Sequence, residues 1–306
     1  MPMLVPTASS TRPHHTPAAE FWRQATVGDL HCGVRHLPPM RLFAYAIAIV
    51  FYLWATLPLW RGQEFDQRIR RQYLLTGSLA LAAHLLSLYV DAHAADGVHL
   101  HFFAALSWVS AGMVSTLLIV GSFRQIEGLG LVVLPIAIGT CLLSALWGAP
   151  TGTGAALTDW RIGLHAILAL TAFATLCVAA LVAVMLGVQD RALRTRQLRP
   201  WLRGAPPLTQ VENLLFQLIG VGFALLSLAL FTGIMFVHDL FAQHLVHKTV
   251  LAIFAWAVFG TLLIGRWRFG WRGRRAIRLV FGGIVLLMLA YLGSKFVLEL
   301  ILQRPV

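Results

Sequence analysis

The sequence predicts an all-α fold, a polytopic membrane helix bundle with eight transmembrane helices. Hydrophobic residues make up 58% of the 306 residues and charged residues only 12%, against roughly 25% charged in soluble domains. The mean hydropathy is +0.75, so lipid must be the solvent for most of the chain. Backbone polar groups in lipid must be satisfied within the segment, which makes each spanning stretch a helix. This composition excludes a soluble enzyme and a collagen.

The first part of the chain, residues 1–40, differs from the rest. It holds six prolines and four histidines, and it lacks an apolar run of spanning length or a signal-peptide core. We expect this tail to be disordered, because it can bury almost no apolar surface. Met40 stands directly before the first span, so a start of translation there is an equal alternative. The membrane domain is expected to occupy residues 41–306.

Eight apolar stretches are long enough to cross a bilayer, which takes about 20 residues. They lie near 41–60, 73–91, 102–122, 129–148, 162–188, 212–237, 247–265 and 277–301. The fifth and sixth exceed the minimum and are expected to tilt or to extend beyond the membrane. Thr209 and Glu212 fit a capping box that opens the sixth helix. The short gaps predict one compact bundle without a separate soluble domain.

Arginine marks alternate gaps between these stretches. Sixteen arginines fall in four alternate gaps, 61–72, 123–128, 189–211 and 266–278, whereas the other three gaps and the span ends beside them contribute only Arg161 and Lys248. Cytoplasmic loops are enriched in basic residues, so the first set is assigned to the cytoplasm and both termini to the periplasmic side. We expect anionic lipids at the arginine clusters. No nucleic-acid partner is expected, since the arginines flank spans and form no basic domain.

Eight histidines lie beyond the tail, all on the outward side or in the outward half of a span. They are His84, His93, His99, His101, His165, His238, His244 and His247. Neutral histidine is tolerated in outward loops that avoid Lys and Arg, so solvation explains the loop members equally well. His84 differs, because it lies about seven residues inside the second span, roughly 10 Å deep. An ionisable side chain at this depth usually faces the bundle interior.

Three spans bring imidazoles toward one outward-facing region. His84 comes from the second span, His165 lies one turn inside the fifth, and His247 begins the seventh. Neutral imidazole is the commonest metal ligand, and histidine pairs can hold haem iron axially. A hydrogen bond to a neighbouring helix is the alternative for each. Anionic groups such as haem propionates would need cations, and Arg161 and Lys248 lie near the outward ends of the later spans.

Another charged pair lies near the outward end of the last span. Lys295 and Glu299 are one turn apart. They can pair with each other, or Lys295 can meet an anionic ligand group.

Three stretches carry a family resemblance. Residues 83–113 hold the histidine within a span, 159–181 hold the histidine at an outward helix end, and 206–268 hold a Pro-Leu-acid helix start followed by Gly222-Phe223 and Gly233. In these features the chain resembles the cytochrome c assembly family of haem-handling membrane proteins, in particular its small inner-membrane members. The likeness covers about residues 41–300.

The resemblance implies ligand positions and also shows departures. It maps His84 and His165 onto haem-ligand positions of different paired sites. The Trp-rich loop of the family corresponds to 237–248, which holds no Trp, and its remaining histidines would fall near Ile264 and in 302–306. By position, His238, His244 or His247 can substitute, and we take His247 as a third haem-binding candidate.

The resemblance implies an inner-membrane protein that binds or passes haem near its outward face in support of cytochrome c assembly. Haem would be its cofactor, and other cytochrome c assembly proteins its partners. No covalent chemistry is implied, so we do not expect an enzyme. Two alternatives remain open, a small-solute transporter and a ligand-free assembly or regulatory subunit on the same scaffold.

Overall fold

The computed structural model describes residues 39–61, 66–94, 102–147, 160–195, 206–236 and 243–293. All of them belong to one compact unit, residues 39–306. The expected tail 1–40 lies outside the described residues, apart from the two residues Pro39 and Met40 that open the first helix.

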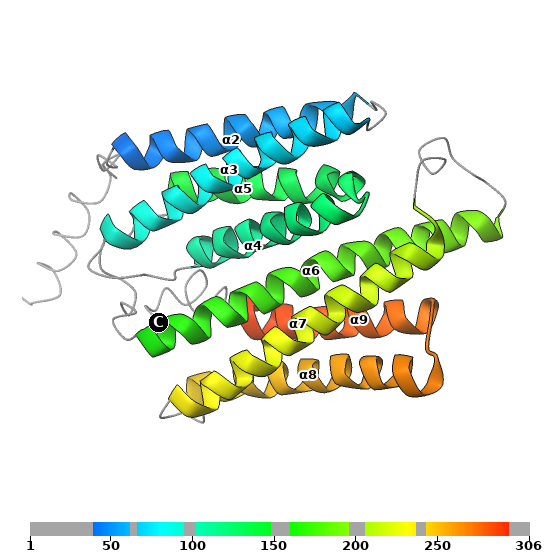
Figure 1. The fold of residues 1–306 in the computed structure, drawn as a ribbon. Coiled ribbons are helices and arrows are strands. Elements are labelled where there is room, and N and C mark those ends of the chain that lie inside the picture. Colours follow the sequence, from blue (N-terminus) through cyan, green and yellow to red (C-terminus); the bar gives the residue numbers. More distant parts are fainter. Residues whose placement is uncertain are drawn as a thin grey trace, which may run out of the picture. The chain divides into compact units, whose positions relative to one another are not determined.

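Every described element is helical, which confirms the predicted fold class (Figure 1). The helices are α2 (Pro39–Trp60), α3 (Gln67–Ala94), α4 (Phe102–Phe123), η1 (Glu127–Leu129), α5 (Gly130–Trp147), α6 (Trp160–Arg194), α7 (Leu208–Phe236), α8 (Gln243–Phe269), α9 (Arg274–Met288) and the π-helical η3 (Leu289–Gly293).

Seven of the described helices, α2 to α8, are long and apolar enough to cross a membrane. The eighth predicted span, near 277–301, is described only over its first part. There α9 runs for 15 residues and continues directly into η3. The structure thus agrees with a polytopic bundle, and the end of the eighth span lies outside the described residues.

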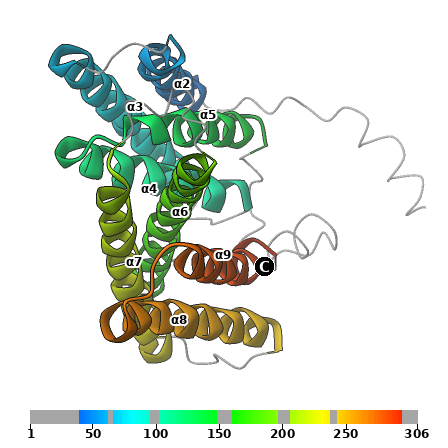
Figure 2. The ribbon, with the colours of Figure 1, turned by 90° about the vertical axis from the view of Figure 1, so that its right-hand side faces the viewer.

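The helices form two groups within this unit. α2, α3, α4 and α5 pack together, and α6, α7, α8 and α9 pack together, with α4 against α6 as the main contact between the groups (Figure 2). Consecutive helices run in opposite directions, so their arginine-bearing ends gather on one side, at the right of Figure 1. We call this side the arginine-rich side. α6 has 35 residues and projects beyond α4 there.

Glycine permits the closest helix approaches. A Cβ atom at Gly112 of α4 would lie 2.8 Å from the Cβ of Ala174 in α6, and one at Gly222 of α7 would lie 2.6 Å from the Leu176 side chain. Without a strong hydrophobic force between helices in lipid, such small residues let backbones pack tightly. The contact between the two groups therefore depends on a position without a side chain.

An ion-pair cluster joins α7, α8 and the connection between α8 and α9 on the arginine-rich side. The Glu212 carboxylate accepts a hydrogen bond from Arg266 at 2.8 Å and lies 3.7 Å from Arg272. The predicted capping box is wrong, because α7 begins directly after Pro207 and Thr209 is already its second residue. The proline sets the helix start, which leaves Glu212 available for the arginines.

Candidate functional site

His84 lies inside the bundle where α2, α3 and α4 meet. Its side chain is fully buried, with Nδ1 3.2 Å from the Tyr52 hydroxyl and Nε2 2.8 Å from the Ser107 hydroxyl. A neutral imidazole has one N–H donor and one acceptor nitrogen, and a hydroxyl can take either complementary role. Both ring nitrogens are therefore hydrogen-bonded. A metal ion at Nε2 would have to replace Ser107.

Further polar contacts hold the same group of helices together. The Ser110 and Thr140 hydroxyls of α4 and α5 lie 2.6 Å apart. The Tyr45 hydroxyl donates to Asp91 at 2.8 Å, and the Tyr45 ring centroid lies 6.4 Å from that of His84. Hydrogen bonds between helices in lipid contribute roughly 1 kcal/mol each. His84 is thus the centre of a buried polar set that fixes α2 to α5 relative to one another.

His165 has a different environment between α6 and α7. Its Nδ1 lies 2.9 Å from the Ala229 carbonyl oxygen and 3.3 Å from the Thr232 hydroxyl. A carbonyl oxygen only accepts, so Nδ1 carries the proton and donates, and the neutral ring has its lone pair at Nε2. Within the described part of the chain, Nε2 has no hydrogen-bond partner. This is the arrangement in which histidine commonly ligates a metal, with its other nitrogen bound to a carbonyl.

A glycine makes room for the His165 ring. A Cβ atom added at Gly233 would lie 3.0 Å from the ring carbon Cε1 and 3.4 Å from Nδ1. Such distances are tighter than ordinary van der Waals contact, so a larger residue would push the ring. Gly233 therefore helps to set the ring position. The family resemblance included Gly233, but nothing in the sequence indicated its contact with His165.

A cation lies one turn from His165 at the same helix end. The Arg161 guanidinium carbon is 5.9 Å from the ring centroids of both Trp160 and Phe236. These two rings lie 6.2 Å apart. Guanidinium groups bind favourably to aromatic faces at such distances. The end of the α6–α7 pair opposite the arginine-rich side thus combines an imidazole, a guanidinium and two aromatic rings.

The structure does not place the predicted ligands in one set. His84 is bonded within the α2–α5 group, whereas His165 is bonded to α7 of the other group. Among the described residues, no group of three or more His, Cys, Asp or Glu could hold a metal ion.

The third candidate, His247, falls in the first turns of α8, but its side chain lies outside the described residues. The side chains of His93, His99, His101, His238, His244, Lys295 and Glu299 lie outside the described residues as well.

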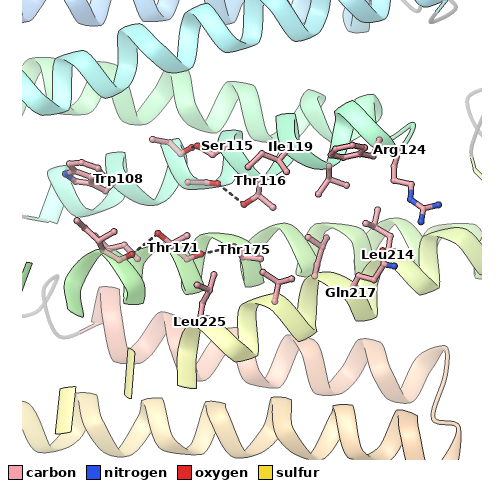
Figure 3. Close-up of a pocket in the computed structure, with 18 of the residues that line it drawn as sticks. Trp108, Ser115, Thr116, Ile119, Arg124, Thr171, Thr175, Leu214, Gln217 and Leu225 are labelled. Atoms are coloured by element: carbon pink, nitrogen blue, oxygen red, sulfur yellow. Dashed lines mark hydrogen bonds between the residues drawn. The ribbon is translucent and has the colours of Figure 1, made fainter. Parts of the chain in front are cut away.

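A groove of about 630 Å³ lies between α4, α6 and α7. Its walls are mostly apolar, and Figure 3 shows it running from Trp108 at one end to Arg124 at the other. Hydroxyl groups along it, such as those of Ser115 and Thr171, donate to carbonyls of their own helices. No histidine, cysteine or methionine lines it, so its described walls offer no usual iron ligand.

Comparisons with known proteins agree with the architecture. A family model described as "Cytochrome C assembly protein" matches residues 72–302. An inner membrane protein named YpjD, from Escherichia coli strain K12, is 33% identical over 237 residues, which covers 76% of this chain and 88% of that protein. No solved structure matches.

More distant relatives are named for cytochrome c biogenesis. The protein CcsA from Mesostigma viride is 32% identical over 85 residues, 27% of this chain and 28% of that protein. CcsA from Gloeobacter violaceus is 29% identical over 91 residues, 29% of this chain and 27% of that protein. Since the family model covers well over half of the sequence, the chain belongs to the cytochrome c assembly protein family.

Proposed function

We propose that this protein is an inner-membrane haem-handling protein that binds or passes haem near its outward face, in support of cytochrome c assembly. Family membership and the similarity to YpjD support the general role and the location. The single observation that supports haem binding most directly is the bond from His165 Nδ1 to the Ala229 carbonyl. It orients a neutral imidazole with a lone pair at Nε2.

His165 is the first candidate ligand in this proposal. Its ring is held by α7, and its Nε2 needs to give up no described hydrogen bond. His84 is the second, and its ligation requires loss of its bond to Ser107 or of its bond to Tyr52. His247 remains a candidate by its place at the start of α8.

A cationic group suits the anionic edge of haem. Arg161 lies one turn from His165 and can pair with a carboxylate in a charge-assisted hydrogen bond. Lys248 near the start of α8 is a further cation on this side. We therefore propose that propionate carboxylates are bound at this end of the α6–α8 helices, with the porphyrin edge toward apolar side chains.

The proposal includes no bond-making chemistry by this chain. Its residues would bind and orient haem, and other cytochrome c assembly proteins would use it. From the arginine distribution we propose that the arginine-rich side faces the cytoplasm and that both termini lie in the periplasm. Arginine clusters would then contact anionic lipids.

A visible absorption spectrum tests this proposal. The full chain is purified in detergent, haem is supplied in excess, and the Soret band is recorded. We expect wild-type protein to bind haem, His165→Gly to lose or shift the band, and added imidazole to restore it by filling the vacated ligand position. His93→Ala is the control and should resemble wild type.

The outcomes separate the function from the sites. Wild-type protein that binds no haem in excess would contradict the proposed function. Haem binding that is unchanged in both His165→Gly and His84→Ala would retain the function and remove both ligand assignments. Loss of the Soret band in His84→Ala but not in His165→Gly, with the amount of protein unchanged, would make His84 the ligand in place of His165.

A further inference from the structure

The groove between α4, α6 and α7 is chemically polarised along its length. At its arginine-rich end lie the guanidinium of Arg124 and the amide of Gln217 (Figure 3). Neither side chain has a hydrogen-bond or ion-pair partner among the described residues, although both carry N–H donors. The remaining wall is formed largely by aliphatic side chains such as Ile119, Val221 and Leu225. Free donors at one end of an apolar channel suit an amphipathic molecule with an anionic head.

The dimensions of the groove suit one hydrocarbon chain. From Trp108 to Arg124 the helix rises about 24 Å at 1.5 Å per residue, which exceeds half of the roughly 30 Å hydrocarbon core. The groove is therefore long enough for one acyl chain to lie along it.

Charge favours an anionic rather than a neutral lipid. Arg124 lies on the arginine-rich side, and the neighbouring Arg70 is already engaged with Glu127 at 3.0 Å and with the Gly121 carbonyl at 2.7 Å. A guanidinium near the headgroup level attracts an anionic phosphate. Gln217 can add a neutral N–H donor beside it.

We propose that this groove binds one anionic phospholipid from the leaflet on the arginine-rich side. The phosphate binds Arg124 and Gln217, and one acyl chain lies between α4 and the α6–α7 pair. Because α4 and α6 form the main contact between the two helix groups, the lipid fills the seam at this contact. The proposal is independent of haem binding.

Native mass spectrometry of the full chain in detergent tests this site, with phosphatidylglycerol or phosphatidylcholine added at equal concentration. We expect wild type to retain one phosphatidylglycerol in preference to phosphatidylcholine. Arg124→Gln should weaken phosphatidylglycerol about fivefold, the equivalent of about 1 kcal/mol, and remove the preference. Arg191→Gln, which alters an exposed arginine outside the groove, is the matched control and should behave as wild type.

A second pair of variants tests the apolar part. Val221→Trp places a large ring in the groove and should lower retention of both lipids, whereas Val132→Trp on the exposed face of α5 should not. Equal losses of phosphatidylglycerol retention in Arg124→Gln and Arg191→Gln would show that the lipid is held by general charge attraction, and would overturn the site. Unchanged lipid retention in Val221→Trp would overturn it too. If that variant kept its lipid but lost a co-purifying membrane protein, the groove would bind a protein partner and not a lipid.

Discussion

At the residue scale, His84 and His165, the two histidines that the family resemblance assigns to haem-ligand positions, differ in their hydrogen bonds. His84 uses both ring nitrogens, with Tyr52 and Ser107 as partners. His165 uses Nδ1 alone among its described contacts. A ligand must offer a lone pair, so binding at His165 costs less local rearrangement than binding at His84. His84 is therefore expected to matter for stability whether or not it binds iron.

Gly233→Ala tests whether the ring position of His165 matters for haem. The added methyl would lie 3.0 Å from Cε1 of His165, so we expect the ring to shift and the Soret band to move or weaken. Gly220→Ala is the control, since a Cβ there meets nothing within 4 Å and lies in the same helix. The absorption spectrum and the protein amount are measured together. An unchanged band in haem-loaded Gly233→Ala would contradict the positioning role without contradicting haem binding.

A double-mutant cycle tests the buried bond between Tyr52 and His84. Tyr52→Phe leaves a ring nitrogen of His84 without its partner, at a cost of about 1–3 kcal/mol in the free energy of unfolding. In a His84→Ala background the same change should cost clearly less, because the bond is already absent. Unfolding in mixed micelles gives the four free energies. Additive effects would show that the 3.2 Å contact contributes nothing to stability.

Sequence reasoning identified both histidines but not their partners. The depth of His84 in an apolar span was readable because hydropathy and helical rise depend only on local sequence. Its bonds to Tyr52 and Ser107 cross 32 and 23 positions, and their formation depends on helix rotation. A tyrosine and a serine within apolar spans gave a weak signal, since a serine can also bond to its own helix and a tyrosine hydroxyl can find several partners.

At the element scale, the apolar stretches predicted the helices well and their polar ends less well. The fifth span was expected over 162–188, whereas α6 runs from Trp160 to Arg194. Residues such as Asp190 and Arg194 continue the helix by an i,i+4 ion pair beyond the apolar part. Hydropathy marks the part of a helix that lies in lipid, but the helix itself ends where its backbone hydrogen bonds end. The capping box predicted at Thr209 was also an error about a helix boundary, because α7 begins directly after Pro207.

Glu212→Gln tests the connection between α7 and α8. Glu212 is buried and pairs with Arg266 at 2.8 Å, so its loss leaves a partly buried guanidinium poorly paired. We expect thermal stability to fall by roughly 1–3 kcal/mol. Asp190→Asn is the control, because its 3.0 Å pair with Arg194 is more exposed and should contribute less than about 1 kcal/mol. Equal effects of the two variants would contradict a special role for the Glu212 cluster.

At the scale of the whole unit, the two helix groups divide the candidate ligands between them. His84 belongs to the α2–α5 group and His165 to the α6–α9 group, and α4 against α6 is the main contact between the groups. A change in that contact would alter the relation between the two histidines. The sequence alone could not predict this relation, because hydropathy does not show which helices pack together.

Membrane orientation decides on which side the His165 end lies. The sixteen arginines on one side predict a cytoplasmic location for the loop between α8 and α9, around Gly270, and a periplasmic location for Val306. We expect green fluorescent protein to fluoresce when fused after Gly270, and alkaline phosphatase to be active when fused after Val306. The second fusion also tests the eighth span, because α9 must continue across the membrane to carry Val306 to the other side. Active phosphatase after Gly270 would reverse the orientation and move Arg161 and His165 to the cytoplasmic face. Fluorescence after both positions would instead leave seven spans and the same outward site.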